Sequence, residues 1–271
     1  MQWLARPTGK RGRSQTFSDA AIQFCLTIKC LFGLPLRQTL GLVQPLLKMA
    51  GLPWVVPDYS TVCHRQKDLD VRVHYRPSRN GLHMLADSTG IKFLGEGEWK
   101  TKKHGAERRR QWCKVHLGID AETLQIRAIV VTTNEVGDSP VVAELLSQIP
   151  SHEKLASLTG DGAYDAHEAC HHRGAIPIIP PRKGARLRKG LAFAHRNEAA
   201  RACKRLGRAI WKRWSGYHRR SLVETKMNCF KRLGEKVMAR TFERQVAELN
   251  IRASILNRFT ELGTPETVAV A

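Results

Sequence analysis

The sequence predicts a mixed α/β sheet domain that follows a small all-helical N-terminal domain. Three observations favour this fold class. Residues 17–75 show helical patterning, residues 82–180 contain short apolar strands and one helix, and residues 183–258 return to helical patterning. Strands that precede and follow a helix indicate a mixed sheet flanked by helices.

The N-terminal segment divides into three helical stretches. The first opens after Ser18, a residue type that caps helices, and closes at Gly33. The second is LRQTLGLVQPLLKMAG, and the third, after a proline-containing break, is the short basic YSTVCHRQKDLD. This order resembles a helix-turn-helix unit, although many all-helical domains share it. In such a unit the third helix would face DNA with Ser60, Thr61, His64, Arg65 and Lys67.

The middle segment begins with LHMLADST, which reads as a buried strand ending at Asp87. Two strands with alternating apolar residues, joined by the turn IDAETL, make up QWCKVHLGIDAETLQIRAIVVTT. The helix SPVVAELLSQI precedes KLASLTGDGAY, a short strand that runs into Asp161 and Gly162. A last strand, AIPIIPPRKG, is stopped by Pro180 and Pro181.

Beyond the strands, residues 183–215 are basic, and we expect a helix in their second half. Helices over 217–233 and 242–258 are expected to precede a frayed tail. The predicted organisation is therefore a helical domain at residues 1–78, a sheet domain at 79–260 with a basic insertion at about 183–215, and a tail at 261–271.

The net charge of +21 is distributed unevenly. Residues 1–80 have 12 Lys and Arg against 4 acids, and residues 183–240 have 18 against 3. By contrast, residues 81–182 have 12 against 13, and residues 241–271 have 3 against 4. Two basic blocks around a balanced middle indicate a polyanionic partner, most simply nucleic acid, with a solvated surface as the alternative.

Composition excludes other classes. No stretch approaches the roughly 20 uncharged apolar residues of a membrane span, and the N-terminus has no signal-like apolar run, so we expect an intracellular protein with no membrane partner. The seven cysteines are scattered, odd in number and without a CxxC pair, which predicts reduced cysteine. The spacing of one cluster matches no standard zinc ligand pattern: His167, Cys170, His171 and His172.

Two acids of the middle segment share a setting. Asp87 and Asp161 each lie at the predicted end of an apolar strand, close to glycine. Sheet enzymes place reacting groups at the carboxyl ends of strands. For either acid alone, a turn or capping role is the simpler interpretation.

A third acid, Glu224, lies alone in the most basic part of the chain. On a helix over residues 217–231, an arc of about 60° contains Tyr217, Arg220, Glu224 and Lys231. The apolar residues fall on the other side: Leu222, Val223, Met227, Phe230 and Leu233. An ordinary amphipathic helix with a charged outer face is the alternative.

Together, Asp87, Asp161 and Glu224 would form an acidic set on a basic surface. Carboxylates brought together repel one another and are stable mainly when cations neutralise them. Such oxygen-rich sites suit Mg²⁺ or Mn²⁺, and two ions about 3.5–4 Å apart can support in-line phosphodiester displacement. The sequence therefore predicts a metal site, with the surrounding cations holding a phosphate backbone.

Three motifs carry a resemblance to a known family. Tyr217, Arg220, Glu224 and Lys231 fit the signature Y-x2-R-x3-E-x6-K, and ADSTG at 86–90 and DGAY at 161–164 resemble the same family's two aspartate motifs. From about residue 10 to about residue 260, the chain resembles bacterial insertion-sequence transposases of the DDE type, in the four/five insertion-sequence group.

The resemblance implies an RNase H-like core in which Asp87, Asp161 and Glu224 are catalytic and bind two Mg²⁺ or Mn²⁺ ions. It implies recognition of terminal inverted repeats, excision, and strand transfer into target DNA by a protein that dimerises on both ends. A cytoplasmic, nucleoid-associated location in bacteria and no small-molecule substrate are further expectations. Two alternatives stay open: a DNA-binding relative without catalysis, and a nuclease that cuts without joining.

Within the resemblance, Arg220 and Lys231 would hold DNA near the cleavage point, and Tyr217 would stack or hydrogen-bond there. The basic segments add four further DNA-binding candidates: Arg65, Lys102, Lys103 and Arg219. Lys102 and Lys103 belong to KTKKHGAERRR at 100–110, for which a solvated hairpin is the alternative. Trp211 and Trp214 could stack on unpaired bases, but core packing is the simpler expectation.

Overall fold

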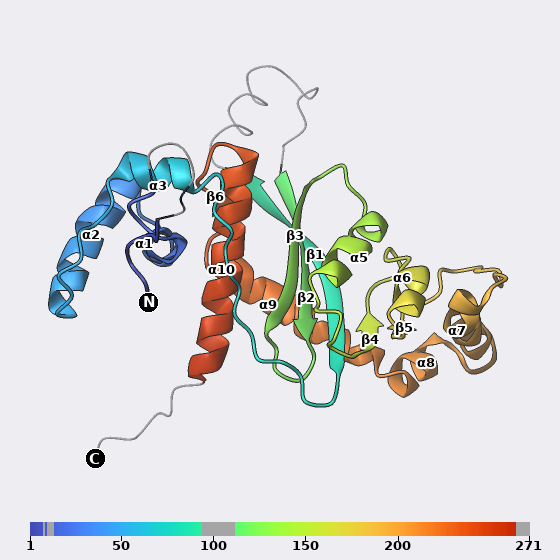
Figure 1. The fold of residues 1–271 in the computed structure, drawn as a ribbon. Helices are drawn as coiled ribbons and strands as arrows, with labels where there is room; N and C mark the ends of the chain where they lie inside the picture. The colour runs from blue at the N-terminus through green and yellow to red at the C-terminus, as the bar shows by residue number, and fades with distance from the viewer. Residues whose placement is uncertain (8, 10–13, 94–111, 264–271) are drawn as a thin grey trace, which may run out of the picture. The chain divides into compact units, whose positions relative to one another are not determined.

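A computed structural model of the protein describes residues 1–7, 9, 14–93 and 112–263 (Figure 1). The chain forms two compact units, and both are built from separate stretches of sequence. We call them the N-terminal unit (Met1–Val73, Phe93–Arg109 and Arg232–Ile255) and the sheet unit (His74–Lys92, Arg110–Lys231 and Leu256–Ala271). The predicted division at residues 78 and 260 stays a prediction.

The N-terminal unit contains the three expected helices, α1 (Asp19–Phe32), α2 (Leu36–Met49) and α3 (Tyr59–Arg65). Ser18 caps α1, because its Oγ accepts a hydrogen bond from the Ala21 amide, and Gly33 ends the helix with a φ of 62°. Asp58 caps α3 in the same way. Ser18 and Gly33 therefore mark the ends of α1 as predicted, whereas α3 ends at Arg65 and not at the predicted Asp70.

A buried ion network ties this unit together. The network centres on Glu248 of α10 (Phe242–Leu262), a long helix that starts in the N-terminal unit. The Glu248 carboxylate accepts hydrogen bonds from Lys29 Nζ at 3.1 Å and from an Arg252 guanidinium nitrogen at 2.9 Å. Lys29, Glu248 and Arg252 are all less than 10% exposed. Glu248 also accepts from the backbone amides of Met238 and Ala239, next to the short strand β6 (Lys236–Val237).

The sheet unit has a mixed sheet with strand order β3-β2-β1-β4-β5 among the described residues. The first three strands are antiparallel neighbours, and β1, β4 and β5 run parallel. Their bounds are β1 (Leu82–Phe93), β2 (Trp112–Asp120), β3 (Ile126–Thr133), β4 (Leu155–Thr159) and β5 (Ile176–Ile178). This is the expected α/β class, with the strand order of an RNase H-like core.

One expectation about β1 is wrong. The strand does not end at Asp87, because its backbone pairing with β2 continues as far as Lys92 opposite Trp112. Asp87 therefore lies in the middle of a long strand. The neighbouring parallel strand, β4, does end close to it, at Thr159.

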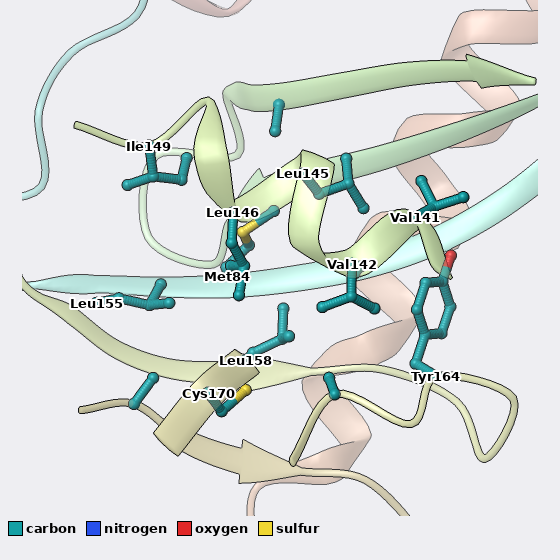
Figure 2. Close-up of a cluster of buried hydrophobic side chains, with 14 of the residues drawn as sticks. Met84, Val141, Val142, Leu145, Leu146, Ile149, Leu155, Leu158, Tyr164 and Cys170 are labelled. Carbon is teal, nitrogen blue, oxygen red and sulfur yellow. The ribbon is translucent and has the colours of Figure 1, made fainter. Parts of the chain in front are cut away.

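The core of the sheet unit lies on one face of the sheet, under α5 (Asp138–Ser147) and α6 (His167–His172). Leu82, Met84 and Ala86 of β1 point to this face, as Figure 2 shows for Met84. Because side chains alternate along a strand, Asp87 points to the opposite face. The core also contains Cys170, which forms no disulfide.

The C-terminal helices differ in detail from the expected ones. The basic segment forms a short 3₁₀ turn η1 (Leu191–Phe193), α7 (Ala194–Leu206) and α8 (Arg208–Trp214), and the two helices are interrupted at Gly207, where φ is 88°. The expected helix over 217–233 starts as a 3₁₀ turn, η2 (Tyr217–Arg220), and becomes α9 (Ser221–Arg232). In Figure 1, α9 crosses the sheet on the face opposite α5.

Within the described residues, we find no single helix long and apolar enough to cross a membrane. The helices α1 and α2 taken together meet the length and composition criteria, but they are bent by 108° relative to each other.

His116 on β2 makes the stability of the sheet unit dependent on pH. Its ring is fully buried, with Nε2 at 3.1 Å from Thr132 Oγ1 and Nδ1 at 3.4 Å from an Asp138 oxygen that also pairs with Lys114. Burial lowers the pKa of His116 from 6.5 to about 4, and the Asp138 carboxylate only partly opposes this effect. Between about pH 4 and pH 6.5, the imidazole of His116 is therefore mostly protonated in the unfolded chain and mostly neutral in the folded protein.

We expect the free energy of unfolding to decrease as the pH falls from about 6.5 towards about 4, because of this histidine. Urea titrations of the wild type and of His116→Gln across this range test the expectation. The variant should lose this component of the pH dependence. Parallel curves for the two proteins would show that His116 does not cause it.

Candidate active site

Of the two aspartates of the predicted acidic set, Asp87 lies on β1, and Asp161 lies two residues beyond the end of the neighbouring parallel strand β4. Leu85 of β1 is paired with Thr159 of β4, and two residues further along each chain come Asp87 and Asp161. Neighbouring strands lie about 4.8 Å apart, so this register places the two backbones side by side. The Asp87 and Asp161 carboxylates are also close enough for their mutual repulsion to affect the pKa of Asp87.

Arg220, at the end of η2, links the first and third acids of the set. One guanidinium nitrogen donates to Asp87 Oδ2 at 2.7 Å, and the other terminal nitrogen donates to Glu224 Oε1 at 2.7 Å. The Asp87 side chain is 12% exposed and that of Arg220 is 19% exposed, whereas Glu224 is 56% exposed. The Arg220 guanidinium thus pairs with two carboxylates, one at each terminal nitrogen, and the Asp87 carboxylate is largely buried.

The buried Asp87 carboxylate depends on the neighbouring positive charge of Arg220. Burial raises the pKa of Asp87 more than the Ser88 amide and the Arg220 guanidinium lower it, and the Asp161 carboxylate raises it further. The pKa of Arg220 is raised, because the attraction of Asp87 and other neighbours outweighs its own burial. The site therefore favours positive charge between its acids.

Asp161 also has a local structural role. Its Oδ1 accepts a hydrogen bond from the Ala163 amide at 2.8 Å, which closes a turn directly after β4. Asp161 therefore has the turn role that is the simpler interpretation of its sequence context. The other carboxylate oxygen, Oδ2, has no protein hydrogen bond among the described contacts.

The face predicted for residues 217–231 is only partly formed. Tyr217 is buried against Trp211, with ring centroids 5.8 Å apart, because the 3₁₀ turn rotates it out of the register of α9. Lys231 lies half-buried near the end of α9. Trp211 packs in the core, as the simpler expectation held, whereas Trp214 is 66% exposed.

A cavity of about 400 Å³ opens beside this site. It lies between α8 and the start of α9 and is lined by Ala209, Lys212, Arg213, Tyr217, His218, Arg220, Ser221 and Glu224. Three of its side chains are permanent cations, and only one is an acid. Lys212 and Arg213 lie just before the signature and His218 lies inside it, at a position that the signature leaves variable, so none of the three is marked by the motif.

Tyr164 is another residue whose placement the sequence does not reveal. Its ring is buried beside Val142 of α5 and anchors the loop that carries Asp161 (Figure 2). Burial, reinforced by the carboxylates of Asp138 and Asp87, raises the pKa of the Tyr164 hydroxyl, so it is neutral at neutral pH. Gly160 approaches this ring closely, because a Cβ there would lie 3.2 Å from it.

Among the described residues, no group of three or more His, Cys, Asp or Glu side chains is placed to hold a metal ion. Asp87, Asp161 and Glu224 do not converge on a common point but are linked through the Arg220 guanidinium and the β1–β4 register. Their donor chemistry nevertheless fits Mg²⁺ or Mn²⁺, because all three offer hard carboxylate oxygens. The cation already held between two of them shows the same requirement for positive charge.

The other predicted DNA-binding residues are placed as follows. Arg219 donates to the Ala121 carbonyl at 3.1 Å, which ties η2 to the turn between β2 and β3. Arg65 pairs with Asp19 and donates to the Phe17 carbonyl, so its guanidinium already has partners within the N-terminal unit. Lys102 and Lys103 lie outside the described residues. DNA contacts by these residues remain predictions.

An RNase H-like sheet has one aspartate on its strand β1, a second just after the neighbouring parallel strand β4, and a glutamate on a following helix that is linked to the first aspartate through an arginine. This arrangement is typical of metal-dependent nucleic-acid enzymes. Comparison with protein families agrees. A family model described as "Transposase DDE domain" matches residues 79–258, and a second model with the same description matches residues 1–96. The chain belongs to the DDE transposase domain family, whose members bind DNA and generally use divalent metal ions.

Proposed function

We propose that this protein is the transposase of a bacterial insertion sequence of the four/five group. It binds terminal inverted repeats and catalyses metal-dependent cleavage and strand transfer, and it acts as a homodimer when it holds both ends. The observation that supports this most is the register that brings Asp87 beside Asp161, with Glu224 joined to Asp87 through Arg220.

In this proposal Asp87, Asp161 and Glu224 hold Mg²⁺ or Mn²⁺. The chemistry that two such ions would supply there is activation of a water or a 3′-hydroxyl and stabilisation of the leaving oxygen of the phosphodiester. The chain supplies the rest of the site. The turn closed by Asp161 and Ala163 orients that carboxylate, and Ser88 orients Asp87 through its amide at 2.9 Å.

The basic segment around α8 and α9 holds the DNA strand. Lys212, Arg213 and His218 line the cavity next to the acids, so a phosphate placed there would meet positive charge on several sides. Arg219, Lys231 and Tyr217 are the remaining candidates on this side of the site. The N-terminal helices, with the exposed side chains of His64 and Lys67, are the candidate for binding the terminal repeats.

A joining assay with terminal-repeat DNA and Mn²⁺ tests the proposal. We expect the wild type to give cleaved and joined products and Asp161→Ala to give neither. Cleavage without joining would support a nuclease instead. Binding without any metal-dependent product would support a non-catalytic DNA-binding protein. Because the repeats are expected to flank the reading frame, a search of the surrounding DNA for inverted repeats supplies the substrate.

A further inference from the structure

Arg220 occupies a position that a pure DNA contact would not need. Its two terminal nitrogens are committed to Asp87 and Glu224, both at 2.7 Å, and it is only 19% exposed. Each terminal nitrogen keeps a second N–H, and Nε has no hydrogen-bond partner among the described residues. The guanidinium therefore neutralises two acids and still has donors that a phosphate could engage.

We propose that Arg220 is an internal cation that holds the acidic set in the DNA-free protein and is displaced when divalent metal and DNA bind, so that each of these ligands strengthens the binding of the other. This inference rests on the proposed function, because it assumes that Asp87 and Glu224 are metal ligands. It assigns Arg220 a positioning role that the signature alone does not predict.

Arg220 and a divalent ion would compete for the same negative charge. Asp87 is buried close to Asp161, and both carry charge that would repel without a neighbouring cation. Arg220 supplies that cation at two of the three acids. A divalent ion that binds these carboxylates competes with the guanidinium for the same negative charge, so the ion pairs reduce metal affinity in the absence of DNA.

The cavity beside the site offers Arg220 a second position. Arg220 and Glu224 form part of its lining, together with Lys212, Arg213 and His218. A DNA phosphate in this cavity would be a new partner for the guanidinium and would draw it away from the carboxylates. Since coupling between two ligands is reciprocal, DNA then increases metal affinity by the same factor by which metal increases DNA affinity.

The test measures Mn²⁺ binding by electron paramagnetic resonance, first without DNA and then with a short duplex of random sequence. Without DNA, we expect Arg220→Ala to bind Mn²⁺ about tenfold more tightly than the wild type, because a competing ion pair is lost. With the duplex present, the gain in Mn²⁺ affinity should be smaller in Arg220→Ala than in the wild type. Arg220→Lys, which can hold only one carboxylate well, should lie between the two.

Arg258→Ala is the matched control. Arg258 pairs with Glu261 at 2.9 Å on α10, so this variant loses the same charge and an exposed ion pair away from the acidic set. Its Mn²⁺ affinity should stay within about twofold of the wild type. An Mn²⁺ affinity in Arg220→Ala that is equal to or weaker than that of the wild type would overturn the inference. If Arg220 only contacts DNA, its loss leaves Mn²⁺ affinity unchanged; if it only supports the geometry of the acids, its loss lowers Mn²⁺ affinity.

The measurement also separates this inference from the proposed function. If Asp87→Asn binds Mn²⁺ as well as the wild type, the metal site itself is wrong and both ideas fail. If Asp87→Asn loses Mn²⁺ but Arg220→Ala does not gain it, the metal site stands and only the role of Arg220 is refuted. A folded Arg220→Ala protein, checked by circular dichroism, is required for either conclusion.

Discussion

Replacement of Glu224 by Gln is expected to lower DNA cleavage by roughly a thousandfold or more while DNA binding persists. The amide keeps the size of the side chain but removes the charge that a divalent ion needs. The cations that hold the phosphate backbone are untouched, so the dissociation constant for DNA should change little. Cleavage of labelled terminal-repeat DNA and a gel-shift titration measure the two properties separately.

Glu198→Gln is the control for this substitution. Glu198 is an exposed acid on α7, in the same basic segment, and its nearest charged partner is His195 at 4.0 Å. Its replacement should leave cleavage within about twofold of the wild type, since an exposed pair of this kind contributes little. Near-normal cleavage by Glu224→Gln would remove Glu224 from the site.

The second large effect concerns stability. Glu248→Ala should lower the free energy of unfolding of the N-terminal unit by about 3–5 kcal/mol, because it leaves Lys29 and Arg252 as buried cations without their carboxylate. It also removes the acceptor for the Met238 and Ala239 amides. Urea denaturation followed by circular dichroism measures the loss.

An exposed acid on the same helix provides the comparison. Glu243 lies in the first turn of α10, and its replacement by Ala should destabilise the unit far less than Glu248→Ala does, because Glu243 is exposed to solvent. A similar loss for Glu243→Ala and Glu248→Ala would mean that the buried network does not stabilise the unit. Lys29→Met combined with Glu248→Leu and Arg252→Met should recover part of the loss, because no buried charge then remains unpaired.

The sequence predicts the elements of this fold well where local signals are strong. Ser18 and Gly33 mark the ends of α1, and the alternation of apolar residues finds β2 and β3. Prediction from the sequence fails where pairing between distant strands decides the bounds of an element. The length of β1 depends on hydrogen bonds to β2, which no local pattern around Asp87 reports.

The candidate active site likewise has parts that the sequence predicts and parts that it does not. The three acids can be found from their motifs, and the in-register placement of Asp87 and Asp161 follows from strands that the sequence does suggest. The ion pair between Arg220 and Asp87 joins residues 133 positions apart in the chain and cannot be read from spacing. An ideal helix drawn from Tyr217 also misplaces that ring, because the first turn is 3₁₀ and Trp211 provides a packing partner.

A crystal structure of the protein soaked with Mn²⁺, recorded at a wavelength that reveals manganese by anomalous scattering, shows directly whether the three acids form a metal site. We expect manganese within coordination distance of Asp87, Asp161 and Glu224, with the Arg220 guanidinium turned away from both carboxylates. Manganese bound elsewhere, or an Arg220 that still bridges Asp87 and Glu224 at saturating Mn²⁺, would contradict this expectation.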